Sequence, residues 1–114
     1  MAQTADDILA VLEKWAAEKQ VIDAHAFLDA AVKLNLLLGD ESDKLFAMEQ
    51  KVSLMRIELL EGGANATIAK MRVEGSDEYR EARSQKAKIE RIIEAIRLAK
   101  HRARLADEEY RSNR

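Results

Sequence analysis

The chain has 114 residues, of which 47% are hydrophobic and 35% charged, with 19 basic and 21 acidic side chains. The absence of cysteine excludes disulfides, thiol catalysis and thiolate metal sites. No apolar run approaches the roughly 20 residues that a membrane span needs. The first residues are polar and acidic and lack a secretory pattern, so we expect a cytoplasmic protein without membrane contact.

The composition is typical of long helices, because it is rich in Ala, Glu, Lys, Leu and Arg. There is no proline, and four glycines provide few turn-forming residues for strands and hairpins. The predicted fold class is therefore all-α. It comprises an N-terminal helical hairpin over residues 1–39, followed by a long antiparallel coiled-coil hairpin over residues 40–114.

The N-terminal hairpin is predicted from its caps and its apolar spacing. Thr4 is suited to cap a helix over residues 5–19, with Asp7 three residues later. A second helix is expected from Asp23, whose carboxylate can cap it. This helix becomes apolar nearly all round toward its end, which is typical of a helix covered on two sides.

The second helix is expected to end at Gly39, because glycine fits the left-handed position after a helix. Residues 40–43 then form an acidic connector. Ser42 or Asp43 is expected to cap the next helix.

A strict heptad begins after this connector and keeps its phase across Gly62 and Gly63. It predicts one helix over about residues 43–73, weakened at the glycine pair, which costs roughly 2 kcal/mol relative to two alanines. A true break at the pair is the competing interpretation. The heptad positions are Leu45, Met48, Val52, Met55, Leu59, Gly62, Ala66, Ala69 and Val73.

A turn is predicted at residues 74–77, with Gly75 ending one helix and Ser76 capping the next. A second heptad follows, at Ala82, Gln85, Ile89, Ile92, Ile96, Ala99, Ala103, Ala106 and Tyr110. Folding the chain back at Gly75 sets large residues against small ones, as interdigitating layers require. The predicted pairs are Gly62 with Ile89, Leu59 with Ile92, Met55 with Ile96, and Met48 with Ala103.

A second apolar stripe on the first arm contains Phe46, Ile57 and Leu60. A lone two-helix hairpin cannot cover it, and uncovered apolar strips are commonly interfaces. We therefore expect a homo-oligomer, a dimer or larger, with assembly contacts from Trp15, Phe27, Phe46, Ile57 and Leu60. Alternatively, Phe46, Ile57 and Leu60 pack under the first two helices of the same chain.

Residues with catalytic chemistry are few. His25 and His101 are far apart, and neither has a metal-ligand spacing. Paired carboxylates suit helix termini or solvated faces. We predict no catalytic, cofactor-binding or metal-binding residue and no enzymatic activity.

Charge is divided between the two halves of the chain. Residues 1–61 carry 6 basic and 12 acidic side chains, whereas residues 62–114 carry 13 and 9. Spaced cations near the C-terminus could follow phosphates, so a nucleic-acid-binding module is one alternative function. No aromatic residue is interleaved with them to stack on bases. The residues predicted to bind an anionic partner are Arg97, Lys100, Arg102 and Arg104.

Residues 76–83 read Ser-Asp-Glu-Tyr-Arg-Glu-Ala-Arg and precede a long charged helix. Over about residues 45–111 the chain resembles small helical coiled-coil accessory proteins of tailed phages. The resemblance implies an adaptor that acts on DNA-processing or host-defence proteins, and it transfers no catalytic residue.

The predicted function is a non-enzymatic helical interaction or adaptor protein that self-associates and binds a protein partner. A further alternative is an inhibitor of a DNA-binding enzyme, in which acidic residues of the first half imitate phosphates. These residues are Asp40, Glu41, Asp43 and Glu49.

Overall fold

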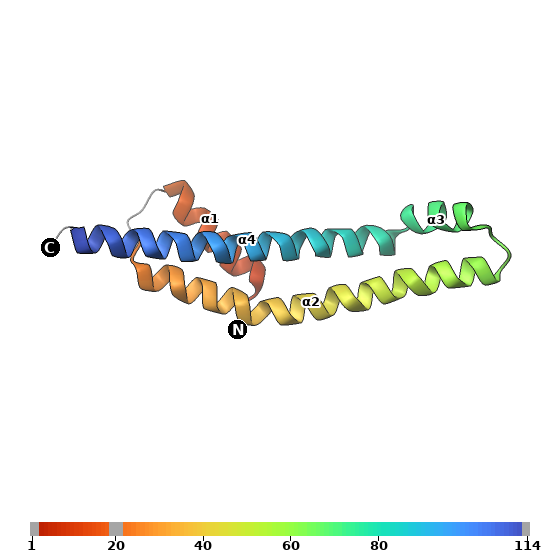
Figure 1. The fold of residues 1–114 in the computed structure, drawn as a ribbon, viewed down its shortest axis with the longest axis horizontal. Coiled ribbons are helices and arrows are strands. Elements are labelled where there is room, and N and C mark those ends of the chain that lie inside the picture. Colours follow the sequence, from red (N-terminus) through yellow and green to blue (C-terminus); the bar gives the residue numbers. More distant parts are fainter. Residues whose placement is uncertain (1–2, 19–21, 113–114) are drawn as a thin grey trace. The chain divides into compact units, whose positions relative to one another are not determined.

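The computed structural model describes residues 3–18 and 22–112 (Figure 1). These ranges contain four helices and no strand: α1 (Ala5–Glu18), α2 (Ala24–Glu61), α3 (Ala66–Glu74) and α4 (Asp77–Ser112). The predicted all-α class, with its helical-hairpin architecture, is confirmed. None of the helices in these ranges has both the length and the apolar character that a membrane span requires.

Three of the predicted N-caps are present. The Thr4 hydroxyl accepts a hydrogen bond from the N–H of Asp7 at 3.2 Å, and the N–H of Thr4 donates to the Asp7 carboxylate at 2.9 Å. This is a reciprocal capping box, which satisfies two otherwise unpaired donors. The Asp23 carboxylate accepts from a first-turn N–H of α2 at 2.8 Å, and the Ser76 hydroxyl does the same for α4 at 3.2 Å.

The predicted helix end at Gly39 is wrong, because α2 continues past it without interruption. A single glycine inside a helix costs only about 1 kcal/mol relative to alanine. Side chains on both sides of it are packed, since Leu34 is fully buried and Glu41 is only 6% exposed. Ser42 and Asp43 are consequently interior residues of α2 and not caps.

The chain turns back at Gly62 and Gly63, where α2 ends. Gly63 has φ 99°, in the left-handed region where residues with a Cβ are strained. The N–H of Ala64 donates to the Leu59 carbonyl at 3.1 Å, and the N–H of Gly63 donates to the Leu60 carbonyl at 3.2 Å. These two bonds are those of a Schellman motif, which pairs the last carbonyls of a helix.

Asn65 starts α3 directly after this turn, because its side chain accepts a hydrogen bond from the N–H of Ile68 at 2.9 Å. The predicted continuous helix over residues 43–73 is therefore wrong, and the competing interpretation, a break at the glycine pair, is confirmed. The heptad concealed the break, because α2 and α3 both have apolar residues at the positions where they face each other.

Gly75 ends α3 as predicted, but the predicted reversal of the chain at Gly75 is wrong. Its φ of −87° and ψ of −1° are right-handed, and α3 and the start of α4 both run back beside the end of α2 (Figure 1). Gln85 is hydrogen-bonded to Glu41, whereas Gly62 lies at the turn and cannot pair with Ile89. Because the turn lies at Gly63 and not at Gly75, the whole predicted register is displaced.

The helices divide between two compact units. Unit 1 comprises residues 1–39 and 90–114, and unit 2 comprises residues 40–89. The predicted domains were residues 1–39 and 40–114, so the division at residue 39 is common to both, whereas the C-terminal part of α4 groups with the N-terminal residues.

Unit 1 has a core to which α1, residues 24–39 of α2 and residues 90–112 of α4 all contribute. Leu34 and Ile92 are its largest fully buried side chains, and Ile8 of α1 is almost fully buried. Several alanines complete the core and allow the helices to approach closely: Ala5, Ala30, Ala31 and Ala99.

Unit 2 is a helical hairpin in which residues 40–61 of α2 lie beside α3 and residues 77–89 of α4 (Figure 1). Ala69, Val73 and Ala82 are buried. Facing them, α2 presents the half-buried residues of the first predicted heptad: Leu45, Met48, Val52, Met55 and Leu59.

Candidate interaction surfaces

Unit 2 contains a polar cluster between α2 and α4, in which the buried Glu41 and Gln85 are joined by the half-buried Lys88 and the exposed Lys44. The Gln85 amide donates to the Glu41 backbone carbonyl at 2.8 Å and to its carboxylate at 2.7 Å. The ammonium groups of Lys88 and Lys44 each lie 3.4 Å from the other carboxylate oxygen. Every polar group of the Glu41 side chain is thus paired.

The charge state of Glu41 follows from these contacts. Burial raises the pKa of its carboxyl, but the hydrogen bond from Gln85 and the charges of Lys88 and Lys44 outweigh burial and hold the pKa below the ordinary 4.5. Glu41 is therefore a hydrogen-bonded, ion-paired carboxylate. A general acid needs the opposite, a raised pKa. A buried polar contact of this kind specifies which residues face each other. We therefore interpret the cluster as the contact that fixes the register of α4 against α2 in unit 2.

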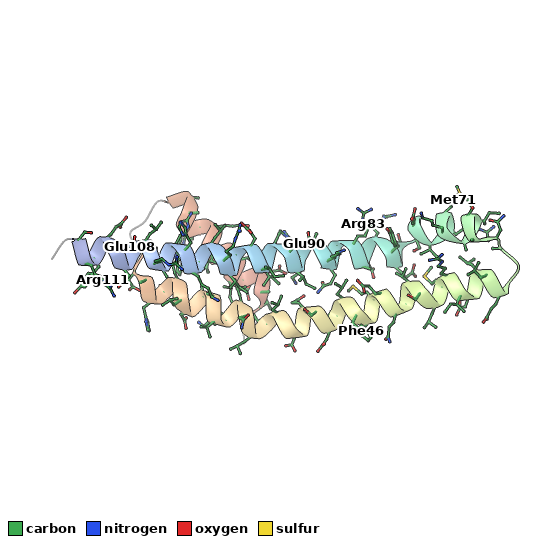
Figure 2. All side chains as sticks on the ribbon, in the orientation of Figure 1. Phe46, Met71, Arg83, Glu90, Glu108 and Arg111 are labelled. Carbon is green, nitrogen blue, oxygen red and sulfur yellow. The ribbon has the colours of Figure 1, made fainter. Side chains whose placement is uncertain are left out.

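The opposite side of α2 in unit 2 forms an apolar surface that we call the outer α2 face. Phe46 is 64% exposed, Leu54 58% and Ile57 49%. The Phe46 side chain is labelled in Figure 2. A shallow groove of about 430 Å³ lies on this face, lined by Phe46, Glu49, Gln50, Ser53 and Leu54. The full face comprises Phe46, Gln50, Ser53, Leu54, Ile57 and Leu60.

Unit 1 has a groove of about 460 Å³ between α1 and α4. Its floor is apolar, with Leu9 and Leu12 from α1, Phe27 from α2 and Leu98 from α4. Its rim is charged and of mixed sign: Asp6 and Glu13 on α1, and Arg91, Glu94 and Arg102 on α4. The mixed rim selects neither an anion nor a cation.

The five residues predicted for self-association fall into two groups. Phe27 is buried inside unit 1, at 6% exposure, where it lines the unit 1 groove, and its assembly contact stays a prediction. The half-buried Trp15 packs edge-on against Phe27, with ring centroids 5.5 Å apart. Phe46, Ile57 and Leu60 are exposed on unit 2.

The four cations predicted to bind an anionic partner are all exposed on α4. Arg97 donates to Glu94 at 2.6 Å, which offsets its charge. Arg102 lines the unit 1 groove, whereas Lys100 and Arg104 do not. Charged side chains project along the length of α4, including the labelled Arg83, Glu90, Glu108 and Arg111 (Figure 2).

Sequence reasoning missed Gln85, Lys88 and Leu54. A pattern for the first was available, because Gln85 is a polar residue at an otherwise apolar heptad position. A buried polar residue there requires a partner on the facing helix. A turn at Gly75 would set Gln85 against a different part of the facing helix, so Glu41 could not be predicted as its partner.

Within the described residues no group of three or more histidine, aspartate or glutamate side chains could hold a metal ion. Comparison of the chain with protein-family models, with curated proteins and with solved structures finds no match. Function is therefore inferred from the surfaces described above.

Proposed function

We propose that the protein is a non-enzymatic helical interaction protein that self-associates through the outer α2 face. The observation that carries this proposal is the exposure of Phe46, Leu54 and Ile57 within about three turns of one helix. Clustered apolar side chains on a surface are typical of protein–protein interfaces.

The architecture of unit 2 supports a second layer of helices. Residues 40–61 of α2 are half-buried on the side that faces α3 and α4 and uncovered on the other side. Two such hairpins can bury their open α2 faces against each other, which packs helix on helix. Removing this apolar surface from water contributes about 25 cal/mol for each Å².

The proposal is tested by replacing Phe46 with Asp and measuring the mass by light scattering. We expect the wild-type protein to have about twice the monomer mass of 12.9 kDa, and Phe46→Asp to have the monomer mass, because a carboxylate is not tolerated in an apolar interface. Circular dichroism checks that the variant remains helical.

Leu36→Asp is the matched control, because Leu36 is a 73% exposed residue of the same helix in unit 1. Its mass should equal that of the wild type. No loss of mass in Phe46→Asp would place the interface elsewhere, and an equal loss in Leu36→Asp would mean that the interface is not confined to the outer α2 face.

Nucleic-acid binding is the second candidate, supported by the exposure of Lys100 and Arg104 on α4. It predicts affinity for a short duplex that falls steeply with salt and is lost when Arg97, Lys100 and Arg104 become Gln. Unchanged binding by that variant would remove this candidate.

The proposed imitation of phosphates by acidic residues has less support. Glu41 is buried and its charge is offset by Lys44 and Lys88, so it cannot present a free carboxylate to an enzyme. Asp40, Asp43 and Glu49 remain exposed. The phage-accessory role and the cytoplasmic location stay predictions.

A further inference from the structure

The outer α2 face carries its own heptad, distinct from the one that faces α3 and α4. Phe46, Gln50, Ser53 and Ile57 recur at alternating steps of four and three residues, which is the spacing of coiled-coil seam positions. All four are exposed. A seam with this spacing is suited to a helix that packs nearly parallel or antiparallel to α2.

Two opposite charges flank this seam on one side. Glu49 and Arg56 each precede a seam position, Gln50 and Ile57 respectively, and are seven residues apart. In a coiled coil such flanking positions form interhelical ion pairs that set partner choice and orientation. In the part of the chain that the structure describes, neither Glu49 nor Arg56 takes part in an ion pair.

We infer that the outer α2 face binds the same face of a second copy in antiparallel orientation. Phe46 of each copy packs against Ile57 of the other, and Glu49 of each copy pairs with Arg56 of the other. The inference rests on the proposed function and specifies its partner and geometry. A two-fold axis makes each of these contacts occur twice.

The charges favour the antiparallel arrangement over the parallel one. In an antiparallel pair, equivalent flanks of the two helices lie side by side, which brings Glu49 and Arg56 together. A parallel pair would set Glu49 beside Leu54, and the two charges would not meet. At the centre of the antiparallel seam Gln50 lies against Ser53, a polar layer that specifies register.

Reversing one charge at a time tests the pairing. Glu49→Arg should set arginine against Arg56 of the second copy, and Arg56→Glu should set glutamate against Glu49. We expect each variant alone to dimerise about tenfold more weakly than the wild type by sedimentation equilibrium. An equimolar mixture of the two variants should recover affinity close to that of the wild type, because every pair is then of opposite charge.

Lys51 and Glu58 supply the matched control. They are also exposed, oppositely charged and seven residues apart on α2, but they lie away from the seam positions. Lys51→Glu, Glu58→Lys and their mixture should all dimerise like the wild type. A comparable weakening in these variants would mean that net charge, and not pairing, controls assembly.

The outcomes separate this inference from the proposed function. A wild-type protein that remains monomeric contradicts both. A wild-type dimer that is unaffected by Glu49→Arg and Arg56→Glu contradicts the inferred register and leaves self-association intact. Weakening by both variants without recovery in the mixture also overturns the antiparallel pairing.

Discussion

Gly63 lies in the turn after α2 and Gly39 lies inside α2. Replacing each with alanine should have opposite effects on the stability of the protein. Gly63 has φ 99°, so Gly63→Ala should destabilise the protein by about 1–2 kcal/mol. Gly39 is a helix-interior residue with nothing within 4 Å of an added Cβ, so Gly39→Ala should stabilise it by roughly 0.5–1 kcal/mol. Urea unfolding measures both, and effects of the same sign would contradict the placement of the turn.

Glu41 makes stability depend on pH. Its pKa in the folded protein lies below the ordinary 4.5, because Gln85, Lys88 and Lys44 stabilise the carboxylate more than burial opposes it. Glu41 therefore contributes stability above about pH 4.5, and this contribution is lost as the pH falls through the folded-state pKa. The urea midpoint of the wild-type protein should fall in this range, and Glu41→Gln should reduce that fall.

The contribution of Asp7 to acid sensitivity must be distinguished from that of Glu41 in this experiment. The hydrogen bonds from the Thr4 backbone and side chain also lower the pKa of Asp7, below 3.8, so Asp7 contributes to the pH dependence in the same direction. Asp7→Asn removes that part alone. If Glu41→Gln retains the full acid sensitivity of the wild type, the carboxylate does not stabilise the fold.

At the scale of single elements, the sequence predicted helix starts better than helix ends. Thr4, Asp23 and Ser76 were identified as caps because the interaction is local and uses a side chain with few alternatives. Gly75 does end α3, as predicted, whereas Gly39 was assigned as a helix end on residue type alone. Tertiary packing decides whether a glycine ends a helix, and this cannot be deduced from one residue.

The true end at Gly63 was concealed by the heptad, which continues from α2 into α3. Asn65 was the overlooked indication, since an asparagine directly after a glycine pair suits a helix cap. The outer α2 face was predicted in part, because Phe46, Ile57 and Leu60 lie outside the apolar stripe of the first heptad. The burial of Phe27 could not be predicted, because its cover by α1 depends on how the helices of unit 1 pack.

Asn65 gives a test of α3 as a separate helix. Asn65→Ala should destabilise the protein by about 1 kcal/mol, because the side chain accepts a hydrogen bond from Ile68 that alanine cannot replace. Asn35→Ala, at an exposed position inside α2, should be neutral or stabilise the protein by a few tenths of a kcal/mol, through helix propensity. If chemical denaturation gives equal effects, Asn65 is not a cap.

At the scale of the whole molecule, each unit has its own means of specifying its packing. Unit 1 has a core in which three helical segments bury Leu34 and Ile92. Unit 2 has fewer buried apolar side chains and adds the polar cluster around Glu41. Its outer α2 face leaves Phe46, Leu54 and Ile57 exposed on one helix, which is why assembly is the central claim.

The most direct test of that claim is the mass of the wild-type protein by light scattering over a range of concentrations, at low and high salt. The same measurement is made with short duplex and single-stranded DNA. We predict a dimer near twice 12.9 kDa that persists at high salt and is indifferent to DNA. A mass of 12.9 kDa at every concentration, increasing only with DNA at low salt, would contradict the claim and assign the function to the cations of α4.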